Sequence, residues 1–165
     1  MIDPRSTPTR TFLVWPVLVL VGSRLARRPL DWRFAPVAAG GYMLYRTAGT
    51  YRTRHGGGGP GMAQPAERLV TTGPYAMSRN PMYLGHLLTF AAFVGATRSR
   101  WSAAVFGWHL RWFDDRAATD ERQLRERFGE DYEHYRAAVP RWLPWRGGQL
   151  RRLLRPPSGT AGADA

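Results

Sequence analysis

The longest stretch without a charged side chain, from Asn80 to Thr97, limits what this chain can fold into. As an α-helix its 18 residues would be about 27 Å long, close to the hydrocarbon thickness of a bilayer. A second apolar run, Trp101–Leu110, follows after a short segment that contains Arg98 and Arg100. The two runs predict an antiparallel helical hairpin, and its first helix is the best candidate for a membrane span.

Two shorter uncharged runs precede this hairpin. Thr11–Ser23 predicts an uncleaved membrane helix that is kinked, or begins, near Pro16. Phe34–Tyr45 is rich in Ala and Gly, which would allow close helix packing in a membrane. Soluble buried helices of the same length are the alternative, and these two runs alone do not decide between them. With the hairpin, they predict an all-α fold, a multi-span transmembrane helix bundle with about four spans.

The segment Arg116–Val139 has the pattern of an amphipathic helix. Its apolar residues fall on one stripe: Leu124, Phe128, Tyr132, Tyr135 and Val139. Gly129 is a candidate for a bend in this helix. We expect this C-terminal helix to lie on the bundle or on the membrane surface. The chain then divides into N-terminal membrane helices (1–50), a Gly-rich linker (51–66), a core (67–145) and a disordered basic tail (146–165).

The charge of the chain restricts its partners. The net charge is +12, and all 24 basic residues are arginine. Nucleic acid and an anionic membrane surface are the two obvious partners for such a chain. Because the arginines lie in loops around apolar runs, we expect the chain to associate with a membrane and not to bind nucleic acid. Their distribution also predicts that both termini face the cytoplasm.

The composition and motifs restrict the chemistry as well. The chain has no cysteine, which excludes disulfides, thiolate metal sites and a cysteine nucleophile. It contains no metalloprotease motif and no phosphate-binding loop, and we predict no metal site.

The segment Glu67–Tyr83 has the features of a shaped polar loop that leads into a helix. The residue before a proline avoids the α region, so Asn80 should be extended or in a turn. Pro81 suits a first helical turn, and the helix should run from about Met82 to Thr97. Free backbone N–H groups at such a start could bind an anionic or polar ligand. An ordinary helix entry would have the same features, so these residues alone leave both interpretations open.

Two blocks in this order resemble the isoprenylcysteine carboxyl methyltransferase and phospholipid methyltransferase superfamily. The first is Gly73-Pro74-Tyr75 followed by Arg79-Asn80-Pro81-Met82-Tyr83-Leu84-Gly85, and the second is Asp120-Glu121-Arg122, Leu124, Phe128-Gly129-Glu130-Asp131-Tyr132, Tyr135, Val139-Pro140-Arg141 and Leu143-Pro144. Members of this superfamily are small membrane-embedded enzymes that use S-adenosylmethionine. The sequence departs from the family at Asn80, where histidine is usual, and at Asp120, where the acidic pair is usually Glu-Glu.

The resemblance also implies site residues. It places Arg116 at the substrate's carboxylate as the catalytic residue, and it assigns the cofactor to Glu67, Arg68, Leu69, Val70, Tyr75, Arg79, Asn80, Pro81, Met82, Tyr83, Asp120 and Glu121. Carboxylates suit the cofactor's ammonium or ribose, arginine suits its carboxylate, and aromatic rings suit its adenine and sulfonium. Arg116 and Asp120 are also spaced to pair with each other on a helix, and the spacing leaves both roles open.

These observations predict an integral membrane, S-adenosylmethionine-dependent methyltransferase of the isoprenylcysteine-carboxyl-methyltransferase type. Its acceptor would be a lipophilic small molecule or a lipid, and Arg116 favours a carboxylate. Its active site would face the cytoplasm. The alternative is a non-catalytic basic membrane protein that binds anionic lipid or acts as a scaffold.

Overall fold

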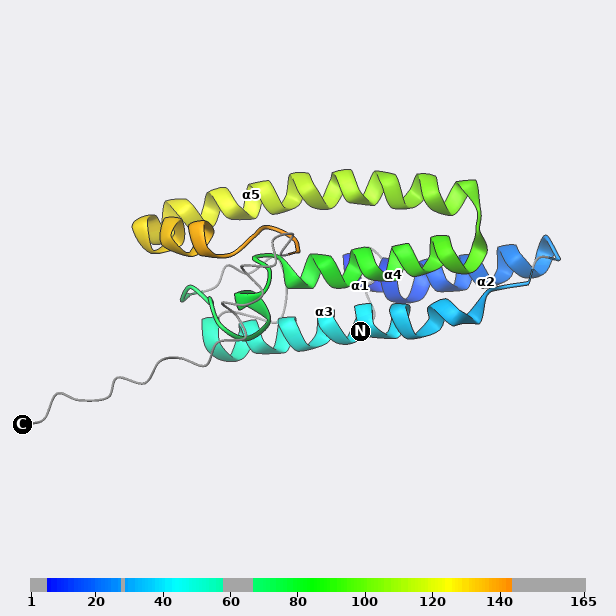
Figure 1. The fold of residues 1–165 in the computed structure, drawn as a ribbon, viewed down its shortest axis with the longest axis horizontal. Coiled ribbons are helices and arrows are strands. Elements are labelled where there is room, and N and C mark those ends of the chain that lie inside the picture. The colour runs from blue at the N-terminus through cyan, green and yellow to red at the C-terminus, as the bar shows by residue number, and fades with distance from the viewer. Residues whose placement is uncertain (1–5, 28, 58–66, 144–165) are drawn as a thin grey trace, which may run out of the picture.

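All regular secondary structure in the described part of the computed structural model, residues 6–27, 29–57 and 67–143, is helical (Figure 1). No strand occurs among these residues, which confirms the predicted all-α class. The elements in order are α1 (Thr7–Thr9), the π-helix η1 (Arg10–Val14), α2 (Trp15–Leu25), the 3₁₀-helix η2 (Trp32–Phe34), α3 (Ala35–Gly56), the 3₁₀-helix η3 (Gly73–Ala76), α4 (Pro81–Thr97) and α5 (Arg100–Ala138).

The N-terminal helix is irregular just before Pro16. The backbone N–H of Trp15 donates to the carbonyl of Arg10, five residues earlier, and this defines the π-helical turn η1. Pro16 has no N–H for the carbonyl of Phe12, so the helix cannot continue with regular α-helical bonds at this point. The predicted irregularity near Pro16 is therefore present, and it takes the form of a wide turn within one helical stretch.

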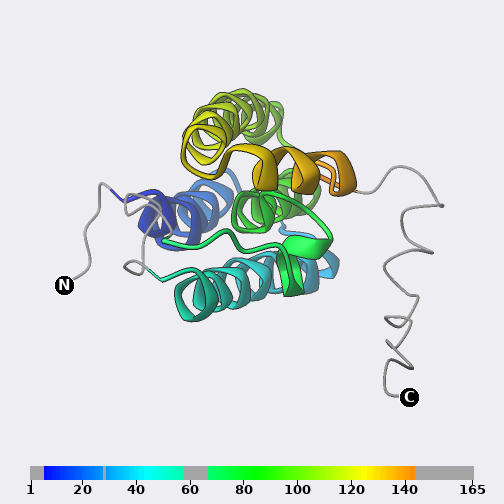
Figure 2. The same cartoon turned by 90° about the vertical axis from the view of Figure 1, so that its left-hand side faces the viewer.

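Helix α4 lies at the centre of the bundle, with α2, α3 and α5 around it (Figure 2). It approaches α3 closely where glycines meet. A methyl group on Gly85 would lie 2.5 Å from the carbonyl oxygen of Gly41, and one on Gly41 would lie 2.6 Å from that of Gly85. This is the close helix packing that the small residues of Phe34–Tyr45 predicted.

Helix α3 is longer than the sequence suggested. It continues past Tyr45 to Gly56 and ends where Gly57 adopts a φ of 68°. The first part of the predicted linker, Tyr51–Gly56, is therefore helical, whereas 58–66 lie outside the described residues. The predicted tail, 146–165, lies outside them as well.

The α4–α5 hairpin forms as predicted. Asn80 has non-helical angles (φ −128°, ψ 52°), and α4 begins directly at Pro81. Arg98 is left-handed, with a φ of 47°, and the Ser99 side chain accepts the N–H of Trp101 to start α5.

The prediction of a separate amphipathic helix that begins at Arg116 is wrong, because α5 continues without a break from Arg100 to Phe128. The chain bends at Gly129, whose φ of 51° and ψ of −123° are not helical. After this bend the last turns of α5 fold back along the bundle (Figures 1 and 2). Across the bend, Arg125 Nε lies 2.6 Å from Glu133 Oε1.

Two apolar clusters hold the helices together. The first joins the end of α3 to the folded-back part of α5, through Ala48, Val70, Tyr75, Tyr132, Tyr135 and Val139. The second joins α4 to α5, through Tyr83, Leu87, Phe90, Phe113 and Ala117. The apolar residues predicted as one stripe do meet, but they do so through the bend at Gly129 and not along a straight helix.

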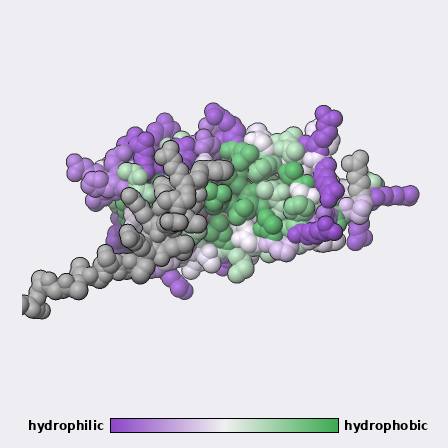
Figure 3. Space-filling model, in the orientation of Figure 1, coloured by the Kyte–Doolittle hydropathy of each residue, from purple (hydrophilic) through white to green (hydrophobic). Residues whose placement is uncertain are grey.

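In the residues that the structure describes, no helix combines the length and the apolar character needed to cross a membrane, so the predicted spans are not confirmed. On the visible face, hydrophobic residues gather in the middle and hydrophilic ones at the ends (Figure 3).

Candidate functional site

The two sequence blocks meet at one end of the bundle. The loop that contains the first block is tied to α3, because the backbone N–H groups of Glu67 and Arg68 donate to the carbonyl of Gly56 at 2.7 and 2.9 Å. It is tied to the second block by the N–H of Arg79, which donates to the carbonyl of Pro140 at 2.9 Å. The Tyr135 hydroxyl adds a bond of 2.7 Å to the carbonyl of Tyr75.

Tyr83, Arg116 and Asp120 form the polar group at this end of α4 and α5. The Tyr83 hydroxyl donates a short hydrogen bond to Asp120 Oδ2, and Arg116 Nε lies 3.3 Å from Asp120 Oδ1. Tyr83 is almost fully buried, whereas the side chains of Arg116 and Asp120 keep 41% and 27% exposure. The carboxylate therefore lies at the boundary between the core and an accessible surface.

Burial raises the pKa of Asp120 above its ordinary value, although the Tyr83 hydrogen bond and the Arg116 charge act in the opposite direction. Arg52 of α3 also acts on this carboxyl through its charge. Asp120 is thus more easily protonated than an exposed aspartate.

A cavity of about 790 Å³ opens beside this group, within the range of about 300–1,000 Å³ that is typical of ligand pockets. The N-terminal segment, α3, α4 and α5 all contribute to its lining: Ser6, Thr7, Pro8, Tyr45, Arg46, Gly49, Thr50, Arg52, Thr53, Arg54, Met82, Trp112 and Arg116. Four of these residues are arginines, and none of the described lining residues is acidic. The cavity therefore suits an anionic ligand with an apolar or aromatic part.

The structure brings only some of the predicted site residues to this cavity. Met82 and Arg116 line it, and Tyr83 and Asp120 lie directly beside Arg116. The other predicted residues do not line it. Glu67 and Arg68 are exposed at the start of the loop, Leu69, Val70 and Tyr75 belong to the first apolar cluster, and Pro81 is buried as the first residue of α4.

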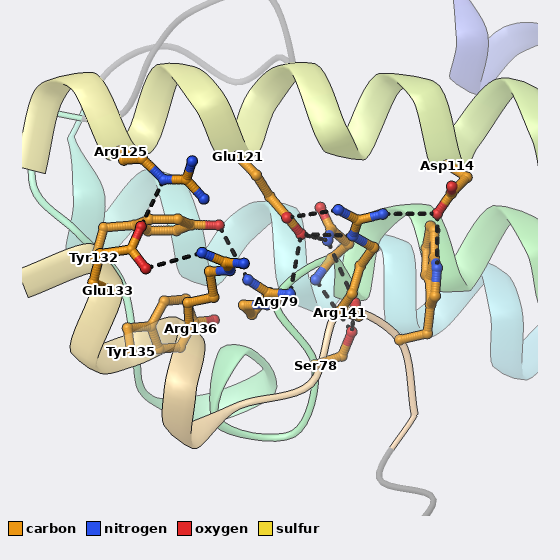
Figure 4. Close-up of polar contacts among 12 residues, drawn as sticks. Ser78, Arg79, Asp114, Glu121, Arg125, Tyr132, Glu133, Tyr135, Arg136 and Arg141 are labelled. Carbon is orange, nitrogen blue, oxygen red and sulfur yellow. Dashed lines mark hydrogen bonds and ion pairs between the residues drawn. The ribbon is translucent and has the colours of Figure 1, made fainter. Parts of the chain in front are cut away.

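Arg79 and Glu121 belong to a second polar group (Figure 4), which also includes Asn80. Arg141 Nε and Nη2 each lie 3.0 Å from an oxygen of Glu121. Asn80 Nδ2 and Arg79 Nη2 approach the same carboxylate at 3.3 and 3.5 Å. Glu121 is thus paired within the protein and is not among the lining residues of the cavity.

Sequence reasoning missed the residues that α3 contributes. Tyr45, Arg46, Arg52 and Arg54 line the cavity but lie at or beyond the predicted end of that helix. The signal was available: Arg46, Gly49, Thr50 and Thr53 have the i, i+3, i+4, i+7 spacing of one helical face. The polar side chains and the following Gly run instead suggested a linker.

His86 of α4 lies behind the cavity wall. Its ring stacks with Phe12 and Phe113, with centroids 4.8 and 5.2 Å away, and makes a tilted contact with Tyr45 at 4.9 Å. It is fully buried, and neither ring nitrogen has a hydrogen-bond partner within the described part of the chain. Tyr45 connects this aromatic group to the cavity, since it also lines the latter.

Comparison with known proteins finds matches to the part of the sequence that includes this end of the bundle. The sequence model of the phospholipid methyltransferase family matches residues 47–131, just over half of the chain. The chain belongs to this family. This confirms the resemblance seen in the two blocks, and the matched region contains Tyr83, Arg116 and Asp120.

A curated relative supports the same superfamily. Protein-S-isoprenylcysteine O-methyltransferase of Schizosaccharomyces pombe is 35% identical over 77 residues, which cover 46% of this chain and 33% of the relative. The chain therefore spans about a third of the length of that relative. No solved structure matches this chain.

Proposed function

We propose that this member of the phospholipid methyltransferase family transfers a methyl group from S-adenosylmethionine to a carboxylate oxygen of a lipophilic acceptor. The observation that carries the proposal is the meeting of Tyr83 and Asp120, from the two blocks, beside the arginine-lined cavity. The family match and the name of the yeast relative support the same reaction class.

The residues around the cavity fit the cofactor. Asp120 offers a carboxylate for its ammonium or ribose, and the arginines offer bidentate partners for its carboxylate. Tyr45 and Trp112 offer aromatic faces for the adenine and the sulfonium. A cavity of about 790 Å³ also leaves room for part of an acceptor.

The chemistry places few demands on the protein. When bound, S-adenosylmethionine supplies a methyl group that its sulfonium makes electrophilic. A carboxylate acceptor is already deprotonated near pH 7, so no general base is needed. The task of Arg116 is to bind and orient that carboxylate, and the task of the cavity walls is to align both molecules and exclude water.

The charge of the cavity favours a carboxylate over an amine. An alkyl amine is cationic near pH 7, and the four lining arginines would repel it. A carboxylate is attracted by the same four charges. We therefore favour O-methylation over N-methylation.

Exposed apolar side chains support a location in a membrane. Val17, Leu18, Leu20 and Val21 of α2 are each between 43% and 53% exposed. Apolar surface of this kind marks membrane or partner contacts. We infer that α2 contacts lipid or the apolar part of the acceptor, and the cytoplasmic placement of the site stays a prediction.

Cofactor binding is the first test. Calorimetry on detergent-solubilised protein should show saturable binding of S-adenosylmethionine that Asp120→Ala abolishes. Arg111→Gln is the matched control, because Arg111 lies on the same helix and pairs with the exposed Asp115 at 3.2 Å. A folded wild type that does not bind the cofactor would refute the proposal and favour the non-catalytic alternative.

Acceptor choice is the second test. Labelled methyl should be incorporated into a farnesylated cysteine with a free carboxylate, and not into its carboxamide or into phosphatidylethanolamine. Arg116→Gln should lower kcat/KM for this acceptor by about 10- to 100-fold, the effect of one lost bond to a charged group. Faster transfer to phosphatidylethanolamine than to the carboxylate would contradict the assignment of the acceptor.

A further inference from the structure

Arg141 connects three parts of the chain that are distant in sequence (Figure 4). Its guanidinium binds both oxygens of Glu121 at 3.0 Å, and its Nη1 lies 3.1 Å from Asp114 Oδ1. Its backbone carbonyl accepts from Ser78 Oγ at 3.0 Å and from Asn80 Nδ2 at 3.4 Å. One residue thus holds both α5 and the loop that leads into α4.

Glu121 is fully occupied by these partners. One of its oxygens meets Arg141, Asn80 and Arg79, and the other meets Arg141 again. Only 8% of its side chain is exposed. A carboxylate so paired has little capacity left for a ligand, and separating it from its cations would leave a charge buried.

The position of Glu121 determines where Asp120 points. The two residues are adjacent on α5, so their side chains leave the helix about 100° apart. Asp120 meets Tyr83, whereas Glu121 meets Arg141. Because both contacts depend on the same rotation of α5, holding Glu121 in place also holds Asp120 against Tyr83.

The same network determines how α4 begins. Asn80 directly precedes Pro81, the first residue of α4, and its amide binds both Glu121 and the carbonyl of Arg141. Tyr83 lies in the first turn of this helix. Both partners of the Tyr83–Asp120 bond are therefore one helical turn or less from a residue that the network holds.

We propose that Arg141 is a positioning residue: by clamping Glu121 and Asn80, it sets the alignment of Tyr83 with Asp120 at the cavity. Glu121 then acts through Asp120 and does not itself contact the cofactor. Arg141 belongs to the second sequence block but lies beyond residues 47–131, the region that the family match covers. The expected effect of Arg141 on cofactor affinity rests on the proposed function.

The test compares Arg141→Gln and Arg141→Lys with Arg136→Gln as the matched control. Arg136 belongs to the same folded-back segment, but its partner Glu133 is 45% exposed. In Arg141→Gln, amide exchange in the helical turn around Asp120 should quicken in the unliganded protein, and cofactor affinity should fall about tenfold or more. Arg141→Lys keeps the charge but loses the planar fork, so it should show a smaller loss of affinity. Arg136→Gln should match the wild type in both measurements.

A pH profile separates positioning from simple loss of stability. Without Arg141, the charge of Glu121 beside Asp120 is less compensated, so acid loss of cofactor binding should begin at a higher pH than in the wild type. Circular dichroism tests whether each variant is folded. If Arg141→Gln does not fold, the amide exchange and cofactor affinity of Arg141→Lys decide whether Arg141 is a positioning residue.

The outcomes remain distinguishable from those for the proposed function. A wild type that does not bind the cofactor refutes the methyltransferase, whereas the exchange measurement still reports on the clamp. Wild-type exchange and affinity in a folded Arg141→Gln would overturn the clamp.

Discussion

Substitution of Gly85 by alanine tests the packing on which the site depends. The added methyl group would lie 2.5 Å from the carbonyl oxygen of Gly41, 2.7 Å from the backbone N of Tyr45 and 3.0 Å from its Cβ. All of these atoms belong to α3, and most are backbone, so no flexible side chain can move away. Helices α3 and α4 must separate by several tenths of an ångström or more.

The expected cost follows from two opposing effects. Overpacking a close-packed interior costs about 1–3 kcal/mol, and the upper end applies here because backbone atoms are involved. Alanine returns about 1 kcal/mol through its higher helix propensity. We therefore expect Gly85→Ala to destabilise the protein by about 2 kcal/mol, a fall in Tm of roughly 4–8 °C for a chain of this length.

Gly40→Ala is the matched control. Gly40 is exposed on α3, and within the described part of the chain no atom beyond its neighbours and the nearby backbone of its own helix lies within 4 Å of the position that its Cβ would occupy. Here only the gain in helix propensity remains, so this variant should be more stable by up to about 1 kcal/mol. Thermal unfolding of both variants in the same detergent, followed by circular dichroism, measures the difference. If Gly85→Ala is as stable as Gly40→Ala, the backbones of α3 and α4 are not closely packed at Gly85.

Gly85→Ala should also affect the site. Tyr45 lines the cavity and contacts His86, and it is the residue that the new methyl group displaces. Cofactor affinity should therefore fall in Gly85→Ala at temperatures where the protein is still folded. Unchanged affinity would mean that the wall formed by α3 is not part of the cofactor site.

Three further predictions concern the polar groups. Burial raises the pKa of Asp120, and on the proposed function its ionised form binds the cofactor, so cofactor affinity should fall on acidification at a higher pH than for an ordinary aspartate. Calorimetry across pH should show no such step in Asp120→Asn. Tyr83→Phe keeps the ring against Phe113 but removes the donor to Asp120, so chemical denaturation should show a loss of about 1–3 kcal/mol. Glu121→Gln leaves the guanidinium of Arg79, whose side chain is 10% exposed, without its counter-ion and should cost about 3 kcal/mol. An unfolding midpoint equal to that of the wild type would rule out this loss.

Short-range features of this protein could be read from the sequence. The start of α4 at Pro81 follows from the steric effect of a proline on the residue before it. The α4–α5 hairpin follows from two uncharged runs with a charged turn between them. The bend at Gly129 also has a local cause, since glycine readily adopts a positive φ.

The contents of the site were only partly predictable. Arg116 and Asp120 are one helical turn apart, and the predicted pair forms. The sequence also left open whether they could serve a site, and the contact from Tyr83 shows that Asp120 has a partner on another helix. Arg79 and Glu121, assigned to the cofactor by resemblance, pair with each other at 3.5 Å, and Glu121 also binds Arg141.

By itself the sequence determined the all-helical class, the hairpin and the family, because periodicity, proline geometry and a spaced motif act over a few residues. The tertiary structure decided which charges meet. Glu121 and Arg141 pair only because the chain folds back after Gly129, and the arginines of α3 reach the cavity only because that helix extends beside α4. Such contacts depend on the path of the backbone between distant residues, which no local pattern specifies.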